Sequence, residues 1–173
     1  MNEVLKNIVT RRSVRKYKSE PVAKDALENI LTAGLYAPSA MNTQNWMLTV
    51  VDDTQKLEEL KNAMAKALNR PDYHRFYGAS VLVIVTVPAD YVHGAVDSAC
   101  VLENMFLAAH AENVGSVWIN QLKDCCNDPD VRRILTSYGI PENHVSFGSG
   151  AFGYADCKLP ADRENKGVLN FVK

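Results

Sequence analysis

The chain has 173 residues, of which 19 are Lys or Arg and 20 are Asp or Glu, giving a formal net charge of −1. Because a typical domain has roughly 150 residues, this length predicts one domain spanning residues 1–173. The 47% hydrophobic and 23% charged residues are typical of a globular protein and argue against disorder. The near-neutral charge argues against a nucleic-acid partner, although a local basic cluster could still hold one phosphate.

The cysteines and the apolar segments predict a cytoplasmic protein with no membrane segment. The spacing of Cys100, Cys125, Cys126 and Cys157 suits neither a disulfide framework nor a zinc site. The adjacent pair Cys125-Cys126 could be redox-active, but adjacency alone does not lower a thiol pKa, so we expect these two thiols to be unreactive. The N-terminal segment lacks the apolar core of a secretory signal. The longest apolar stretch, 81–87, is far too short to cross a bilayer and is interrupted by Thr86.

Apolar periodicity predicts helices alternating with strands in the first half of the chain. The spacing of apolar residues indicates a short helix over 2–10, and Pro21 suits the first turn of a second helix that ends at 37–38. We then predict a strand over 46–51, a helix that begins at Asp53 or Thr54 and reaches Leu68, and a fully apolar strand over 80–87.

The second half continues this pattern around one unusually apolar helix. Residues 97–112 are apolar on nearly all sides, which predicts a helix buried within the protein or between subunits; its polar exceptions are Glu103, Asn104 and His110. A strand over 116–119, a helix from Asp128-Pro129 to about Tyr138 and a strand over 144–154 follow. The tail, 158–173, is either a frayed end or an arm docked on another surface.

Several familiar motifs are absent or out of context. The stretch GSGAFG at 148–153 resembles a dinucleotide-binding loop, but it is itself strand-like and no predicted helix follows, so its glycines indicate a bulge or close packing. No P-loop, HExxH helix or GxSxG elbow occurs. The four histidines are scattered and are interpreted as structural or exposed. Glu58 and Glu59 are helix neighbours that point in different directions.

A cationic cluster, RRSVRKY, follows the first predicted helix. Cations there complement the negative end of a helix, an effect worth about 0.3–1 kcal/mol that would account for one or two of them. If the segment is extended, Arg11, Ser13 and Arg15 share one side. Two guanidinium groups with a hydroxyl between them suit a phosphate, because arginine offers planar, permanently charged pairs of donors.

A polar loop, APSAMNTQNW, lies between the second helix and the first strand. Ser and Asn in such loops commonly bond the local backbone. Their side-chain amides are equally able to contact the edge of a heterocycle, because each offers a donor and an acceptor. Together the two clusters predict a site for a phosphate joined to a ring.

In these segments the chain resembles the nitroreductase family of flavoproteins. The pieces that carry the resemblance stand in order over essentially the whole chain: RRSVRKY, APSAMNTQNW, DSACVLENMFLAAHAENVGSVWI and DRENK. The resemblance implies an α+β fold with a central mixed or antiparallel sheet flanked by helices. It also implies an obligate homodimer with an FMN at each of two interfacial sites, reduced by NADH or NADPH.

The resemblance also assigns cofactor contacts by motif position. Phosphate contacts are implied at Arg11, Arg12 and Ser13, with further contacts from the tail at Arg163 and Lys166. Arg15 matches the family's cation near flavin N1, where reduction places negative charge. Contacts around the ring are implied for a second group, formed by Pro38, Ser39, Asn42, Gln44 and Asn120.

We therefore expect an FMN-dependent NAD(P)H oxidoreductase acting on a nitroaromatic, a quinone or a related small electrophile. No side chain is expected to be an indispensable acid or nucleophile, because the cofactor performs the hydride chemistry. The chain departs from the family pattern at two places. Asn45 replaces the usual proline before Trp46, which predicts a less rigid loop, and the short stretch from Ile119 to His144 leaves little room for the helices that often cover the pocket. The alternatives are a flavin-dependent dehalogenase or flavin-cleaving enzyme, a non-catalytic FMN-binding module, and a phosphate-ligand binder without flavin.

Overall fold

A four-stranded antiparallel sheet in the order β1-β2-β4-β3 forms the centre of the structure, a computed structural model that describes residues 1–73, 76–160 and 163–173. Its strands are β1 (Met47–Val51), β2 (Val81–Pro88), β3 (Gly115–Ile119) and β4 (His144–Gly153). In the central pair, Val81 lies opposite Phe152 and Pro88 opposite His144, with a register shift between Val85 and Thr86. The predicted α+β class and antiparallel sheet are confirmed.

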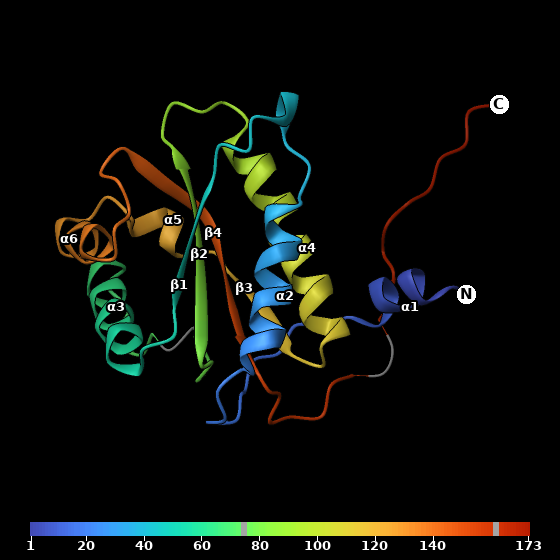
Figure 1. Ribbon diagram of the computed structural model, residues 1–173, viewed down its shortest axis with the longest axis horizontal. Coiled ribbons are helices and arrows are strands. Elements are labelled where there is room, and N and C mark those ends of the chain that lie inside the picture. The colour runs from blue at the N-terminus through green and yellow to red at the C-terminus, as the bar shows by residue number, and fades with distance from the viewer. Residues whose placement is uncertain (74–75, 161–162) are drawn as a thin grey trace.

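Helices cover both faces of this sheet (Figure 1). One face carries α3 (Thr54–Ala67), α5 (Leu122–Cys125) and α6 (Pro129–Ser137), and the other carries α2 (Lys24–Leu35) and α4 (Gly94–Ala111). Outside α4 lies α1 (Glu3–Thr10), and the short 3-10 helix η1 (Ala40–Asn42) lies in the loop between α2 and β1. Because the central strands are covered on both faces, β2 is apolar along nearly its whole length.

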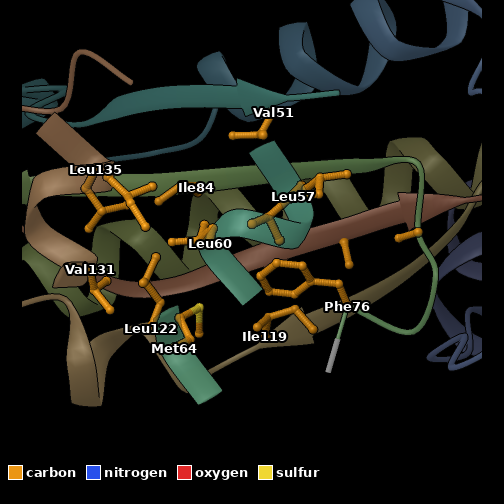
Figure 2. Packing of buried hydrophobic residues seen from close by; sticks show 14 of the residues in the cluster. Val51, Leu57, Leu60, Met64, Phe76, Ile84, Ile119, Leu122, Val131 and Leu135 are labelled. Atoms are coloured by element: carbon orange, nitrogen blue, oxygen red, sulfur yellow. The ribbon is translucent and has the colours of Figure 1, made fainter. Parts of the chain in front are cut away.

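The first core lies between the sheet and α3, α5 and α6. In α3 the buried side chains are Leu57, Leu60 and Met64, whose spacing of three and four residues places them on one helix face. Figure 2 shows this face directed at Ile84 of the sheet and at the neighbouring helices. The apolar periodicity of the sequence therefore predicted the inward face of α3 correctly.

The second core explains why α4 is apolar on nearly all sides. Leu102, Met105 and Phe106 of this helix are buried with Ile30 of α2 and Phe152 of β4. The helix contacts β2, β3 and β4 on one side and α2 and α1 on others. A helix enclosed on several sides has little room for polar residues, so its composition follows from its position.

Helix boundaries agree with the sequence where a side chain caps the helix. Asp53 accepts a hydrogen bond from the Lys56 N–H, and Asp128 accepts from the N–H groups of Asp130 and Val131, as expected of N-caps. The predicted start of the second helix at Pro21 was wrong, because α2 begins at Lys24. The preceding residues stay extended toward β4, where the Ala23 N–H donates to the Tyr154 hydroxyl at 3.3 Å.

Two further boundaries differ from those expected. The helix predicted from residue 97 begins three residues earlier, as α4 starts at Gly94. The four-residue helix α5 had no counterpart in the prediction, because one turn is too short to show a period. Across the described ranges, which leave out 74–75 and 161–162, no helix has both the length and the apolar content required to cross a membrane.

The glycines of the GSGAFG stretch lie within β4 and permit close packing, as predicted. A Cβ on Gly148 would lie 2.5 Å from Cζ2 of Trp118, and one on Gly150 would lie 2.6 Å from Cε2 of Phe152. A register shift also occurs beside this stretch, between Val85 and Thr86 of the partner strand. The segment is therefore a strand built for close aromatic packing and not a nucleotide-binding turn.

We predict that Gly150→Ala destabilises the fold by about 1–3 kcal/mol, because Phe152 is fully buried and its ring would have to move. Urea unfolding monitored by tryptophan fluorescence measures this change. Lys24→Ala on the exposed surface of α2 is the control and should change stability by less than about 0.5 kcal/mol. Equal stability of the two variants would contradict the packing described here.

Candidate functional site

The cationic segment after α1 is extended, the conformation in which its functional side chains share a side. The Val14 N–H donates to the Ser116 carbonyl at 2.9 Å, and Ser13 forms a parallel bridge with Ser116 at the edge of the sheet. Val14 is buried, whereas Ser13 is half-buried and Arg15 exposed. Val14 therefore holds the segment to the protein while Ser13 and Arg15 lie on the accessible side.

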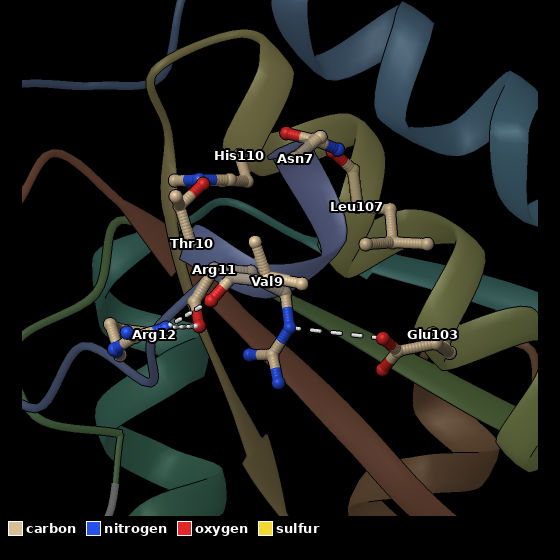
Figure 3. Close-up of polar contacts among 8 residues, drawn as sticks. All are labelled: Asn7, Val9, Thr10, Arg11, Arg12, Glu103, Leu107 and His110. Atoms are coloured by element: carbon tan, nitrogen blue, oxygen red, sulfur yellow. Dashed lines mark hydrogen bonds and ion pairs between the residues drawn. The ribbon is translucent and has the colours of Figure 1, made fainter. Parts of the chain in front are cut away.

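Three contacts to α4 fix the start of this segment (Figure 3). The Asn7 side-chain amide donates to the Leu107 carbonyl at 2.9 Å, and the Thr10 hydroxyl lies 2.9 Å from Nε2 of His110. Nε of Arg11 lies 3.8 Å from Oε1 of Glu103. The guanidinium of Arg11 is held on its inner side by Glu103, with its terminal nitrogens directed away from that contact.

The hydrogen bonds of Thr10 decide the tautomer of His110. The Thr10 hydroxyl donates its proton to the Lys6 carbonyl at 2.7 Å, so toward His110 its oxygen can only accept, and Nε2 must carry a proton. Burial, and then the charges of Arg11 and Arg12, lower the pKa of His110 below its ordinary value. His110 is therefore held as a neutral donor that ties the end of α1 to α4.

Arg12 binds the C-terminal end of α1, which the sequence analysis gave as one explanation for cations in this cluster. Its Nη1 donates to the Val9 carbonyl at 2.8 Å and to the Arg11 carbonyl at 2.9 Å. These contacts satisfy carbonyls at the negative end of α1, where cations are favourable. Within the cluster, Arg12 serves the helix end, whereas Arg11, Ser13 and Arg15 stay predicted contacts of a phosphate-bearing ligand.

The polar loop at 38–44 is strained and carries exposed polar side chains. Met41, Asn42 and Gln44 have φ angles of 52°, 55° and 50°, a region that costs non-glycine residues free energy. The Ser39 hydroxyl accepts from the Gln44 N–H at 3.0 Å, and Oδ1 of Asn42 accepts from the Gln44 side-chain amide at 2.9 Å. The local bonding is thus confirmed, and Pro38, Asn42 and Gln44 are also exposed.

The remaining predicted contacts are exposed side chains. Asn120 lies directly after β3, where its carbonyl accepts from the Lys123 N–H at 3.3 Å. Arg163 and Lys166 are exposed in the tail, and Lys166 pairs with Glu164 at 3.4 Å. The tail passes α1, and its C-terminal end extends away from the sheet and helices (Figure 1).

The polar loop and helix α1 contact different ends of α4, and Arg11 contacts Glu103 between them. The loop contacts Asp97, near the start of the helix, whereas α1 contacts Leu107 and His110, near its end. Asp97 and Leu107 are ten residues apart, which at roughly 1.5 Å per residue is about 15 Å along the axis. Figure 1 shows the η1 loop and α1 at opposite ends of α4.

Comparison with known proteins identifies the architecture that carries these clusters. The model of the Nitroreductase family matches residues 8–154. This chain belongs to the nitroreductase family. The resemblance stated from its motifs is confirmed.

Relatives and solved structures of the family agree over nearly the whole chain. A nitroreductase with bound FMN from Bacteroides fragilis is 40% identical, with a TM-score of 0.94 and full coverage of both chains. A protein of Archaeoglobus fulgidus with a provisional NADH dehydrogenase/NAD(P)H nitroreductase name is 32% identical over 89% of this chain and 86% of its own length. The NADPH-flavin oxidoreductase of Vibrio harveyi is 28% identical over 90% of this chain and 67% of its own length.

Cys125 and His144 lie outside the two clusters, in surroundings that favour a structural role. Burial raises the pKa of the Cys125 thiol to about 12, which supports its interpretation as unreactive. His144 lies half-buried, 3.2 Å from the Thr86 hydroxyl. Among residues 1–73, 76–160 and 163–173, no three His, Cys, Asp or Glu side chains gather as metal ligands would. His74 lies outside the described residues.

The sequence analysis missed three residues that support the clusters of this nitroreductase-family chain. Tyr91 and Asp97 contact the loop, and Glu103 contacts Arg11. The sequence analysis noted Glu103 as a polar exception in an apolar helix but gave none of the three a supporting role. Asp97 could have been found by the same signal. It is a buried carboxylate near the start of α4, and buried carboxylates almost always have partners.

We predict that His110 makes the fold less stable in mild acid. Its pKa is lowered in the folded state, so the unfolded chain binds more protons and stability falls as pH drops through the ordinary histidine value of about 6.5. His110→Gln keeps a side-chain donor for Thr10 but removes the titration. Urea unfolding at about pH 7.5 and about pH 5.5 should show a smaller loss for the variant. An equal loss in both proteins would refute this role.

Proposed function

We propose that this protein is an FMN-dependent oxidoreductase that takes a hydride from NADH or NADPH and passes it to a small electrophile such as a nitroaromatic or a quinone. The observation that carries the proposal is the extended Arg11–Arg15 segment, which presents guanidinium groups and a hydroxyl on one side. Membership in the nitroreductase family supports it. So does the FMN-bound Bacteroides fragilis structure, with 40% identity over the whole chain.

The phosphate group of FMN fits the Arg11 segment chemically. Arg11 is held through Nε by Glu103, and its terminal nitrogens remain directed outward as a pair of donors. The half-buried Ser13 hydroxyl adds a donor beside it. Arg12 supports the same site by holding the end of α1, and Arg163 and Lys166 are proposed as further phosphate contacts from the tail.

The isoalloxazine ring fits the exposed amides and the remaining arginine. We assign Pro38, Ser39, Asn42 and Gln44 to its edge, and Asn120 to the region near N5. Bound FMN supplies the hydride chemistry, while the chain binds and orients it. Arg15 would stabilise negative charge on the reduced ring, which favours reduction. The proposal includes no side-chain acid or nucleophile, and the chain needs none to hold the ring.

A homodimer is part of the proposal, and the apolar surface that the chain exposes supports it. In a two-fold dimer, the loop of one copy meets the segment of the other, and the exchange repeats by symmetry. Helix α1 has no buried residue and exposes four apolar side chains, Val4, Leu5, Ile8 and Val9. An exposed apolar face of this kind is typical of an interface between subunits.

We also propose that residues 158–173 form an arm that docks on the partner subunit. The end of the tail exposes apolar side chains that the rest of the chain leaves uncovered, namely Val168, Leu169, Phe171 and Val172, each at least 79% exposed. Docking would bury them and bring Arg163 and Lys166 to the partner's site.

We further propose that residues 1–173 act as one domain. A cytoplasmic location is supported by the four free cysteines and by the proposed use of NAD(P)H.

The visible absorbance of the purified protein is the first test of this function. The purified protein should be yellow, and anaerobic NADH or NADPH should bleach its flavin absorbance rapidly. A protein that retains FMN but bleaches with neither donor would be a binding module and not a reductase. A colourless protein that cannot be reconstituted with FMN would refute the proposal.

Arg11→Ala tests the phosphate site within the same experiment. Loss of a charge-assisted hydrogen bond, worth about 1.5–3 kcal/mol, should weaken FMN binding by about 10- to 100-fold, measured by fluorescence titration. Lys24→Ala removes an exposed cation from α2 and serves as the control, with affinity unchanged within about twofold. Equal losses in the two variants would show that net charge, and not the Arg11 geometry, holds the phosphate.

The arm is tested by substituting one of its apolar side chains. Phe171→Ser should raise the dimer dissociation constant by about 10- to 100-fold, since burying one large apolar side chain is worth about 1.5–3 kcal/mol. Asn170→Ser, at the adjacent position, is the matched control. Sedimentation equilibrium over a range of protein concentrations measures both constants. A stable monomer that keeps its FMN would contradict both the dimer and the arm.

A further inference from the structure

A chain of hydrogen bonds ties the strained loop to the start of α4. The Thr43 hydroxyl lies 2.7 Å from the Tyr91 hydroxyl, which in turn donates to Oδ2 of Asp97 at 2.6 Å. Tyr91 has one hydroxyl proton, so Thr43 must donate to Tyr91. The second oxygen of Asp97, Oδ1, accepts from the Ala40 N–H at 3.3 Å. The loop is therefore fastened to one carboxylate at two points, Ala40 directly and Thr43 through Tyr91.

The carboxylate at the base of this chain is rigidly placed. Asp97 is 3% exposed and lies in the first turn of α4, where a negative charge is favourable. Burial makes an unsatisfied carboxylate costly, so each of its oxygens needs a donor. These donors are the Tyr91 hydroxyl and the Ala40 N–H. The hydrogen bond to Asp97 is also the main cause of the raised pKa of Tyr91.

The two attachment points flank the part of the loop that most needs support. Met41 and Asn42, between Ala40 and Thr43, both have positive φ angles, and Gln44 follows with a third. Such conformations persist only where the surroundings impose them. Without the attachment at Thr43, the loop would relax toward ordinary backbone angles, and the amides of Asn42 and Gln44 would change direction.

We propose that Tyr91 and Asp97 are positioning residues that hold the 38–44 loop in the conformation in which it binds the isoalloxazine ring. They act through the loop and carry no chemistry themselves. The inference rests on the proposed function for its catalytic consequence, because the ring is the ligand that the loop would orient. The hydrogen-bond chain itself is a property of the protein with or without cofactor.

The decisive variants remove one hydroxyl at a time. Thr43→Val and Tyr91→Phe keep the shape of each side chain but break the chain between Thr43 and Asp97, whereas Thr43→Ser keeps it. Loss of one such hydrogen bond should weaken FMN binding by about 3- to 10-fold and alter the visible circular dichroism of bound flavin. Thr43→Ser should restore both. Tyr138→Phe removes a tyrosine hydroxyl that bonds the Lys56 carbonyl far from the loop and should change neither.

Two further measurements separate this role from a general loss of stability. The double variant Thr43→Val/Tyr91→Phe should bind FMN no more weakly than Tyr91→Phe alone, because Tyr91→Phe already removes the hydrogen bond between Thr43 and Tyr91. Additive losses would overturn the proposal. Hydrogen exchange of residues 40–44 in cofactor-free protein should be faster in Thr43→Val and unchanged in Tyr138→Phe.

The exchange measurement keeps failure of the inference distinct from failure of the proposed function. Faster exchange in Thr43→Val, together with a wild-type protein that never binds FMN, would support the anchoring and refute the flavin function. Normal FMN binding by every variant, with unchanged exchange, would overturn the anchoring and leave the flavin function standing.

Discussion

The enclosure of α4 between the sheet, α2 and α1 is the constraint on which the rest of the structure depends. A helix that is apolar on nearly all sides is stable only when several elements cover it, and here Leu102, Met105 and Phe106 meet both α2 and the sheet. Because it is held so firmly, α4 can serve as a rigid base for exposed segments. Asp97 near its start holds the polar loop, and Leu107 and His110 near its end hold α1.

The same helix also holds both clusters. The loop is fastened at Asp97, and the cationic segment is fastened at Glu103, six residues further along α4. The apolar outer face of α1 and the apolar end of the tail add surface that the chain does not cover itself. A symmetric pair of chains would cover these apolar surfaces and would also bring together the two halves of the proposed site. The proposed site therefore depends on the proposed dimer.

Charge in this protein is balanced overall and concentrated locally. The total of 19 basic and 20 acidic residues conceals three arginines between residues 11 and 15, and the structure divides their work. Arg12 bonds carbonyls at the negative end of α1, whereas Arg11 is steadied by Glu103 with its donors directed outward. The two neighbouring arginines have different tasks because Arg12 folds back onto the end of α1 while Arg11 faces α4, and composition alone could not separate these tasks.

The sequence by itself determined what depends on local interactions. The caps at Asp53 and Asp128 and the buried face of α3 follow from residues close together in the chain, and the family resemblance follows from short motifs along it. Only the tertiary structure decided the strand order, the attachment of both clusters to α4, and the chain of hydrogen bonds from Thr43 through Tyr91 to Asp97. These features join residues tens of positions apart, and no local spacing records such contacts because they form only when the apolar helix and sheet pack together.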